Sequence, residues 1–378
     1  MSRDTVTISA IGRASRRITI DRCTQYELTR DLTGPSEARF EFGDDDSWAD
    51  LEDAIATGTR YQVQVNGVPW VTGRTLTRAL PVSASGGSTI QLTVRSRLAD
   101  AMFASCDPKV RVAKDTLKAL IVDAYASIGL TAADIVFIDV TDRELAAGTG
   151  VNGDKDPEAR QKFRVMFPDD ARVHPPETVH QYTERHLNRF GLTQWDLPDG
   201  RIAIGAPDDL QAPSYRFRCH RGAGRNGGNN IINATRMEDY EGVPEELTLC
   251  GYGAIAYSAS TAYKFTVTDQ RQYALEERLR RRVLVLDPAI NRDAMGEMRA
   301  RKEMAQRSRQ KDAYQIEVDG WTNNNNVLDV NKVADIQIDT AKVPGGAHLI
   351  WRVELSGNAQ QGHTARVATV ARGIWRLS

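Results

Sequence analysis

Histidine and cysteine are the residue types in this chain best suited to metal binding or nucleophilic catalysis, and their spacing argues against both. The six histidines form no HExxH motif, and His180 and His186 are six residues apart, which would place them on different faces of a helix. Cys219 and His220 are adjacent, whereas cysteine hydrolases bring these two groups together from separated elements. We therefore expect no metal site and no catalytic residue.

Glycine-rich and acidic segments are the remaining candidates for binding chemistry. Residues 222–228 are rich in glycine, but they match no P-loop and lack the preceding buried strand and following helix of a dinucleotide site. Residues 44–46 and 208–209 are acidic, but neither segment has the spaced oxygen ligands of a calcium loop. We interpret the first segment as a linker and the others as solvated turns or helix caps. No cofactor is predicted.

Composition excludes several broad classes of protein. The 49 Lys and Arg residues nearly balance the 50 Asp and Glu residues, so the net charge gives no general attraction to nucleic acid. No stretch approaches the roughly 20 apolar residues of a membrane span, and the N-terminus lacks the apolar core of a secretory signal. We expect a protein made in the cytoplasm, with reduced and mostly buried thiols at Cys23, Cys106, Cys219 and Cys250.

The first hundred residues alternate between apolar and polar side chains with the period of half-buried strands. Asn66-Gly67 is a two-residue hairpin signal, because both positions of a type I′ turn need a positive φ. This pattern predicts a first antiparallel β-barrel domain over residues 1–104. Its expected strands include residues 6–9, 17–20, 38–42, 61–65 and 89–94.

Residues 105–221 are predicted to form a mixed α/β domain. Apolar positions have helical spacing over residues 115–125 and 176–190, and Gly129 and Gly191 are expected to end these two helices. Short strands are expected between and after them, at residues 135–138, 192–195 and 201–204.

A segment inside this domain, residues 147–175, is long for a loop in a compact fold. It is rich in Gly, Asp and Pro, so it could be a solvated, disordered excursion. It also contains an apolar cluster, which favours a projecting arm that packs on another subunit or protein. We therefore predict partner contacts at Phe163, Val165, Met166 and Phe167.

A second β-barrel domain is predicted over residues 222–262 and 313–378. Its strands alternate with period two at residues 231–236, 246–252, 313–318, 333–338, 347–355 and 365–370. A helical, basic insertion at residues 263–312 interrupts them and contains a long helix over residues 292–310. The return of a β-rich unit suggests a diverged internal duplication.

The arginine run in this insertion is the strongest local charge in the chain. Arg278, Arg280, Arg281 and Arg282 would wrap most of a helical turn, with several glutamates nearby. A charged solvent face or ion pairs between subunits are the expected outcome, with nucleic acid contact as the alternative. We predict partner contacts at Arg280, Arg281 and Arg282.

The order of these parts resembles the baseplate hub family of contractile-tailed phages, with Mu-like tail hubs as the best match and T4-type hubs and late control D proteins as relatives. The resemblance spans nearly the whole chain in three loose patterns. They are the opening barrel with Tyr61–Val65, Asn66-Gly67 and Arg95–Asp100, the segment from Glu177 through Gly191 to Trp195 and Ile202, and the helix ending at Gln310 with Val318–Trp321, Asn331–Val333, Trp351–Val353 and Gly362–Val370.

The resemblance implies an α+β fold, with two antiparallel β-barrel domains of similar fold plus mixed α/β domains in a multi-domain hub. Three subunits would form a homotrimeric ring of six similar barrels, which stacks on a sixfold tail tube and receives a threefold central spike. DNA would meet the protein only in transit through a central channel. Further implied partners are the baseplate wedge proteins and the tape measure protein, and the implied location is the tail baseplate of the virion after assembly in the host cytoplasm.

Two alternatives remain open from the sequence. The hub portion of a type VI secretion spike or of a phage-tail-like bacteriocin shares this architecture. A tail-associated cell-wall hydrolase belongs to a different class, since function depends on sites and not on folds alone. The missing catalytic motifs favour a structural protein over an enzyme.

Overall fold

The computed structural model of the protein describes residues 4–11, 23–43, 58–79, 81–83, 87–108, 117–138, 173–220, 228–239, 242–251, 264–268, 282–287, 290, 293–309, 311–339, 345–358 and 362–376. Most of them form antiparallel β-strands, and four α-helices accompany these strands. The predicted strand at residues 17–20 lies outside the described residues.

The first β-unit follows the predicted alternation. In β3, Phe40 and Phe42 are buried in the core, whereas the alternate residues Arg39 and Glu41 stay accessible. This is the pattern of a strand with one buried face. Asn66 and Gly67 have φ angles of 52° and 79°, so the predicted hairpin between β4 and β5 is confirmed. The strands are β1 (Val6–Ile11), β2 (Cys23–Asp31), β3 (Glu37–Gly43), β4 (Arg60–Val65), β5 (Val68–Ala79), β6 (Val82–Ser83) and β7 (Gly87–Ser96).

The second β-unit is built mainly from the C-terminal part of the chain. Its strands are β11 (Tyr215–Cys219), β12 (Ile231–Met237), β16 (Ala313–Asp319), β19 (Val333–Ile338), β20 (Gly346–Asn358) and β21 (Gly362–Ala371), with the short hairpin β17 (Thr322–Asn323) and β18 (Asn326–Val327). Apolar side chains again occupy alternate positions, and they join those of the first unit in one hydrophobic core.

The two units share one strand topology. Five strand pairings in the first unit have counterparts in the second, in the same chain order: β1·β4 with β11·β19, β4·β5 with β19·β20, β5·β7 with β20·β21, β3·β7 with β16·β21, and β2·β3 with β12·β16. One pairing differs, because β1·β4 is antiparallel and β11·β19 is parallel. The predicted pair of similar β-units is therefore confirmed, as two halves of a curled sheet.

The correspondence extends to two of the strand irregularities. β5 has a bulge at Leu76 relative to β7, and β20 has one at Trp351 relative to β21. β2 and β12 each have a bulge one residue after their first position, at Thr24 and Ile232. Because a bulge displaces every later side chain of its strand, two matched bulges fix the same register in both units.

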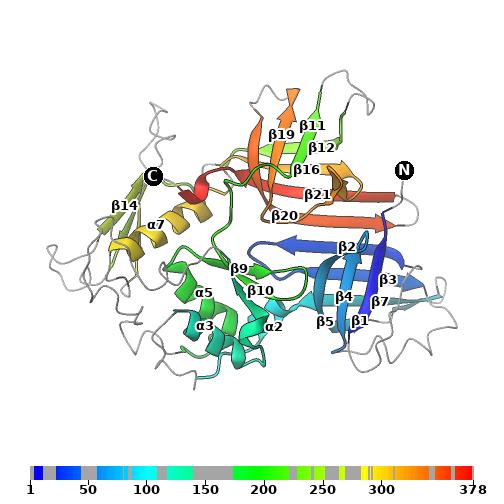
Figure 1. Ribbon diagram of the computed structural model, residues 1–378, viewed down its shortest axis with the longest axis horizontal. Coiled ribbons are helices and arrows are strands. Elements are labelled where there is room, and N and C mark those ends of the chain that lie inside the picture. The colour runs from blue at the N-terminus through cyan, green and yellow to red at the C-terminus, as the bar shows by residue number, and fades with distance from the viewer. Residues whose placement is uncertain are drawn as a thin grey trace.

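Strand β20 joins the two units. The first residues of β20 pair with β19, and its later residues, Arg352–Asn358, pair with Asp31–Gln25 of β2. The strands thus form one continuous sheet in the order β1-β4-β5-β7-β3-β2-β20-β21-β16-β12. Figure 1 shows the blue strands of the first unit continuing into the red strands of the second across this joint.

The joint depends on a close contact between an aromatic ring and a glycine. Gly357 lies opposite Tyr26, and a Cβ at this glycine would come within 2.3 Å of the Tyr26 hydroxyl oxygen. The ring of Tyr26 cannot move freely, since it packs edge to face on Trp321, with ring centroids 5.3 Å apart, and its hydroxyl hydrogen-bonds His363 Nδ1 at 2.5 Å.

Gly357→Val is therefore expected to lower the free energy of unfolding by about 1–3 kcal/mol, because the added side chain forces Tyr26 out of its place. Gly346→Val in the same strand is the matched control, since a Cβ at Gly346 meets no atom within 4 Å. Urea denaturation of both variants would check this, and equal losses would contradict the role of the contact.

The mixed α/β part contains the predicted helices and strands. Its elements are α2 (Arg97–Phe103), α3 (Leu117–Ala126), the 3-10 helix η1 (Ala132–Asp134), β8 (Ile135–Phe137), α5 (Val179–Asn188), β9 (Thr193–Asp196) and β10 (Ile202–Gly205). Gly129 and Gly191 follow α3 and α5 with φ angles of 81° and 66°, as expected for residues that end a helix. Thr178 caps α5 by accepting a hydrogen bond from the Gln181 amide.

The insertion forms a second small sheet. Its order is β14 (Lys264–Thr268), β13 (Glu246–Cys250) and β15 (Arg282–Leu286), and α7 (Asp293–Arg307) packs against β13 and β14. Side chains of this sheet and of α7 share a hydrophobic core with α3 and α5. In Figure 1 this region lies beside the helices, away from the long sheet.

The structure differs from the predicted domain boundaries at two strands. β13 was expected in the second barrel, but it pairs with β14 and β15. Residues 215–219 were assigned to the mixed domain with no strand predicted, but they form β11, which pairs with β19 of the second β-unit. The alternation within a strand does not indicate which strand it pairs with.

Candidate functional site

The most extensive functional surface in the described part of the chain is the polar face of the long sheet. The strand register places polar side chains opposite one another from strand to strand, across both units and the joint between them. Moving from β12 through β16, β21, β20, β2 and β3 to β7, this row contains Asn233, Glu317, Arg366, Glu354, Thr29, Glu37 and Arg95. The opposite face of the same strands is the hydrophobic core.

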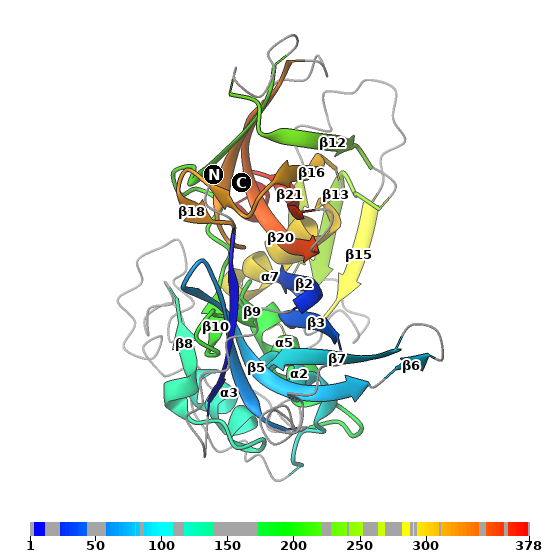
Figure 2. The ribbon, with the colours of Figure 1, turned by 90° about the vertical axis from the view of Figure 1, so that its right-hand side faces the viewer.

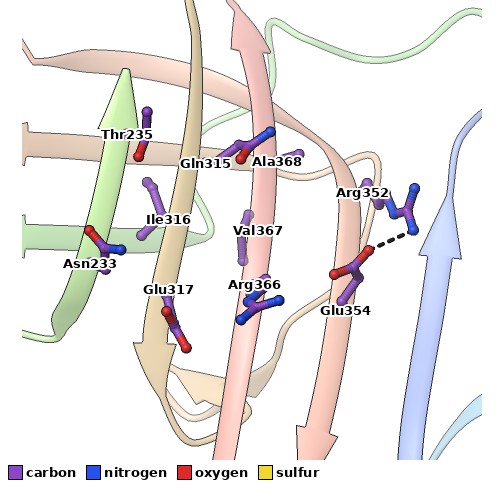
Figure 3. Close-up of a pocket in the computed structure, with 10 residues that line it drawn as sticks. All are labelled: Asn233, Thr235, Gln315, Ile316, Glu317, Arg352, Glu354, Arg366, Val367 and Ala368. Atoms are coloured by element: carbon purple, nitrogen blue, oxygen red, sulfur yellow. Dashed lines mark ion pairs between the residues drawn. The ribbon is translucent and has the colours of Figure 1, made fainter. Parts of the chain in front are cut away.

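This polar face is hollowed at two adjoining places. A cavity of about 460 Å³ lies over β12, β16, β21 and β20, and Figure 3 shows its lining side chains on these strands. A second hollow of about 320 Å³ lies over β2, β3 and the loop between them. Arg352 lines both, so the two hollows belong to one concave surface.

Positive and negative side chains alternate on this surface. Arg352 Nη2 lies 2.6 Å from Glu354 Oε1, and Arg95 Nε lies 2.7 Å from Glu37 Oε2. Arg39 also pairs with Glu37, and the hydrogen bond that its guanidinium donates to this carboxylate raises the pKa of Arg39. Paired charges of this kind leave a wet surface with little net attraction for either sign of ligand.

Two of the histidines weighed as metal ligands, His180 and His186, are buried. His180 and His186 both lie on α5, where burial lowers the pKa of each. His186 packs edge to face on Tyr182, with ring centroids 4.8 Å apart. His220 Nδ1 lies 2.7 Å from Asp339 Oδ2, so this imidazole is paired with a carboxylate.

Within the residues that the structure describes, no three His, Cys, Asp or Glu side chains gather closely enough to hold a metal ion. No described helix combines the length and the apolar character needed to cross a membrane. Cys106 and Cys250 are buried free thiols, and burial raises the pKa of Cys106 to about 11, which disfavours the reactive thiolate.

One of the seven residues predicted to contact partners, Arg282, lies within the described part of the chain. Phe163, Val165, Met166, Phe167, Arg280 and Arg281 lie outside the described residues. Arg282 is described, and it begins strand β15 with its side chain 3.1 Å from Glu246 of β13. The expected helical geometry of the arginine run is therefore wrong at Arg282, because parallel pairing with β13 holds this residue in a strand.

Sequence reasoning missed an exposed apolar pair next to that arginine. Leu284 and Leu286 of β15 are 64% and 58% exposed. They alternate with the half-buried Val283 and Val285, and Val285 packs against the hydrophobic core that this sheet shares with α3 and α5. The strand alternation of residues 282–286 could have revealed these leucines, but the preceding run of charges suggested a helix.

Comparison with known proteins gives a consistent fold. No family model and no curated protein sequence matches the chain. Among solved structures, a tail protein from Neisseria meningitidis MC58 has a TM-score of 0.71 at 15% identity, covering 99% of this chain and 98% of its own. The 43 kDa tail protein of prophage MuSo2 from Shewanella oneidensis has a TM-score of 0.69 at 16% identity, covering 98% and 99%.

A more distant neighbour comes from a secretion system. An E. coli component of the type VI secretion system, described as structurally similar to the T4 bacteriophage tail proteins gp27 and gp5, has a TM-score of 0.56 at 10% identity. It covers 96% of this chain and 76% of its own. At such identities the likeness shows a shared fold, and this fold is the one that the sequence resemblance implied.

Proposed function

We propose that this chain is the structural baseplate hub of a phage tail, a homotrimer that adapts a sixfold tail tube to a threefold central spike. The observation that carries the proposal is the pair of β-units with one topology and one register, joined edge to edge in a single sheet. Three such chains present six similar units, which is the number that a sixfold tube requires. A chain with a single unit of this kind would need six copies for the same match.

The neighbours in fold support a structural role. Two of them are tail proteins, one of them from a prophage, and both match almost the full length of this chain. The described residues gather no metal-binding cluster, and the charged side chains of the polar face are arranged in ion pairs. A virion tail component is the role that fits these observations best.

The polar face of the sheet is the surface that we assign to the central channel. DNA must pass through a hub without being retained, and each phosphate neutralised by a bound cation adds affinity that must be broken again. On this face the arginines have acidic neighbours, as in Arg352 with Glu354 and Arg366 opposite Glu354. The remaining implied partners are the tube, spike, wedge and tape measure proteins, with the assembly formed in the host cytoplasm.

Light scattering of the purified protein is expected to give three times the 41.9 kDa mass of the chain. Immunogold labelling of purified tails with an antibody to this chain should mark the junction between tube and spike. A monomeric mass at micromolar concentration, together with particles that carry no label, would contradict the proposal.

The hub portion of a secretion spike is the second candidate, favoured by the E. coli neighbour that covers 96% of this chain. The two candidates differ in what is lost when the gene is deleted. Loss of infectious particles would indicate a phage tail, whereas loss of contact-dependent secretion with phage production intact would indicate a secretion system.

A further inference from the structure

The long sheet has an open strand edge at two places among the described strands, at β12 and at the last residues of β5. β12 pairs only with β16 among the described strands, so its other edge has no described strand beside it. In the first unit, β4 pairs with β5 only as far as Thr75. Beyond the bulge at Leu76, β5 pairs with β7 on one side, and no described strand lies on its other side. Open edges of this length invite pairing with another chain.

The joint within the chain shows how another strand pairs with such an edge. After its bulge at Trp351, β20 receives β2, and Leu32 N–H donates to the Trp351 carbonyl at 3.1 Å where the two strands meet. β5 is the counterpart of β20, and β12 is the counterpart of β2. β12 and the end of β5 could therefore form a second joint of the same kind, but they lie on opposite sides of the molecule.

Figures 1 and 2 agree on this placement. Both views show β12 at the upper end of the molecule and β5 at the lower end. The two edges cannot meet within one chain, but they can meet between two copies arranged head to tail. A head-to-tail contact closes into a ring when its rotation divides a full turn.

We infer that β12 of one copy pairs antiparallel with the end of β5 and with β6 of the next copy, in the register that β2 and β20 use within the chain. The inference rests on the homotrimer of the proposed function, and it names the surface that builds it. Carrying the β2·β20 register over to the matching positions places Asp239 opposite Thr77, Glu238 opposite Arg78, Met237 opposite Ala79, Thr235 opposite Pro81 and Asn233 opposite Ser83.

Two features of the edges fit this register. Glu238, which already pairs with Arg236 of its own chain, would directly face Arg78, and the opposite charges at these positions favour the cross-strand pairing. Pro81 lacks an N–H, but its carbonyl accepts a hydrogen bond from Thr89 N at 3.0 Å, so its backbone faces β7. The proline therefore removes no donor from the edge that would receive β12.

A disulfide between Met237→Cys and Ala79→Cys tests the register. These positions match Thr29 and Glu354 of the joint. Leu32 N–H donates to the Trp351 carbonyl, and hydrogen-bonded pairs recur at every second residue, here at Arg30 and Leu28. Thr29 and Glu354 therefore face each other as a pair without backbone hydrogen bonds between them. Such pairs have Cα atoms about 4.5 Å apart, within the range of a disulfide. Under mild oxidation, most of the double variant is expected to run as a covalent trimer on non-reducing gels.

Two further double variants control the experiment. Thr29→Cys with Glu354→Cys lies across the joint within one chain, so it should form a disulfide in the monomer band and prove that the oxidation works. Thr235→Cys with Ala79→Cys shifts the register by two residues, beyond disulfide reach, and should crosslink at least tenfold less. The wild-type protein reports any crosslinking by the native thiols.

The outcomes separate the two proposals. A trimeric mass by light scattering, with no crosslink at Met237 and Ala79 while the Thr29 and Glu354 control is oxidised, would overturn this interface and leave the hub standing. Equal crosslinking by the shifted pair would also overturn the register. A monomeric mass with no crosslink would overturn both the interface and the homotrimer.

Discussion

Asp196→Ala is expected to lower the free energy of unfolding by about 3–5 kcal/mol. The Asp196 carboxylate is 3% exposed and accepts hydrogen bonds from Ser36 N at 2.9 Å, from Ser96 Oγ, and from Leu98 N at 3.3 Å. Alanine leaves these donors buried without an acceptor, and each one costs about 1–3 kcal/mol. Urea denaturation followed by circular dichroism measures the loss.

The effect is large because Asp196 joins the mixed α/β part to the first β-unit. Ser36 directly precedes β3 and Ser96 ends β7, whereas Asp196 itself ends β9 of the mixed α/β part. Its backbone carbonyl also accepts from Arg30 Nη2 at 2.7 Å, and Arg30 pairs with Asp329 at 2.5 Å. Burial raises the pKa of Asp196, and the hydrogen bond from Ser96 opposes that rise.

Asp199→Ala is the matched control, since it makes the same chemical change three residues away. The Asp199 side chain is 45% exposed and pairs with Arg201 in a solvated turn. Its loss should stay below about 1 kcal/mol. Similar losses in the two variants would show that the carboxylate network at Asp196 contributes nothing special.

The hydrogen bonds to the Asp196 carboxylate could not be predicted from the sequence. The three donors to Asp196 lie 160, 100 and 98 residues away in the chain. Alternation predicts which residues face a core, but it carries no information on which distant donor meets which acceptor. The strand that ends at Asp196 was predicted, and the role of its last residue was not.

Strand β2 was not predicted because it contains a buried charged residue. Its core-facing positions include Leu28 and Arg30, and the arginine breaks the apolar alternation that identified the neighbouring strands. Arg30 is only 2% exposed because Asp329 and the Asp196 carbonyl neutralise and bind it. No strand was predicted here, although β2 forms the joint between the two units.

The internal duplication was predicted from the return of a β-rich unit, but its register could not be. Matching positions hold unlike residues: Tyr26 corresponds to Ala234, and Thr29 corresponds to Met237. Bulges and strand pairings persist where side chains have diverged, because backbone hydrogen bonds fix them. The polar row of the candidate site depends on the same register, so the sequence indicated its alternating residues but not their alignment.

A buried lysine supplies the second large expected effect, a dependence of stability on pH. Lys302 of α7 is 2% exposed, and its Nζ donates to the Leu192 carbonyl. Burial lowers the pKa of Lys302 to about 7, with Glu184 opposing this shift and Arg299 adding to it. His180 on α5 lies in the same region, and burial lowers its pKa as well.

The sign of the effect follows from proton binding. An unfolded lysine keeps its proton up to a pKa of about 10.4, whereas folded Lys302 releases it at about 7. Between these values the unfolded chain binds one more proton, so acidification favours unfolding by about 1.4 kcal/mol per pH unit. Below about pH 7 both states hold the proton, and the contribution of Lys302 stops changing.

The wild-type protein is therefore expected to lose about 2–3 kcal/mol of its free energy of unfolding through Lys302 between pH 9 and pH 6.5, and Lys302→Met should remove this loss. The measured quantity is the difference in free energy of unfolding between wild type and variant at each pH. Urea denaturation at intervals of half a pH unit provides the curve, and groups common to both proteins cancel in the difference. Lys332→Met, at an exposed lysine, is the matched control and should leave the slope unchanged. If the Lys302 difference stays constant over this range while both variants fold, the lysine keeps its proton in the folded protein, and the local environment of α5 and α7 must then stabilise a buried charge.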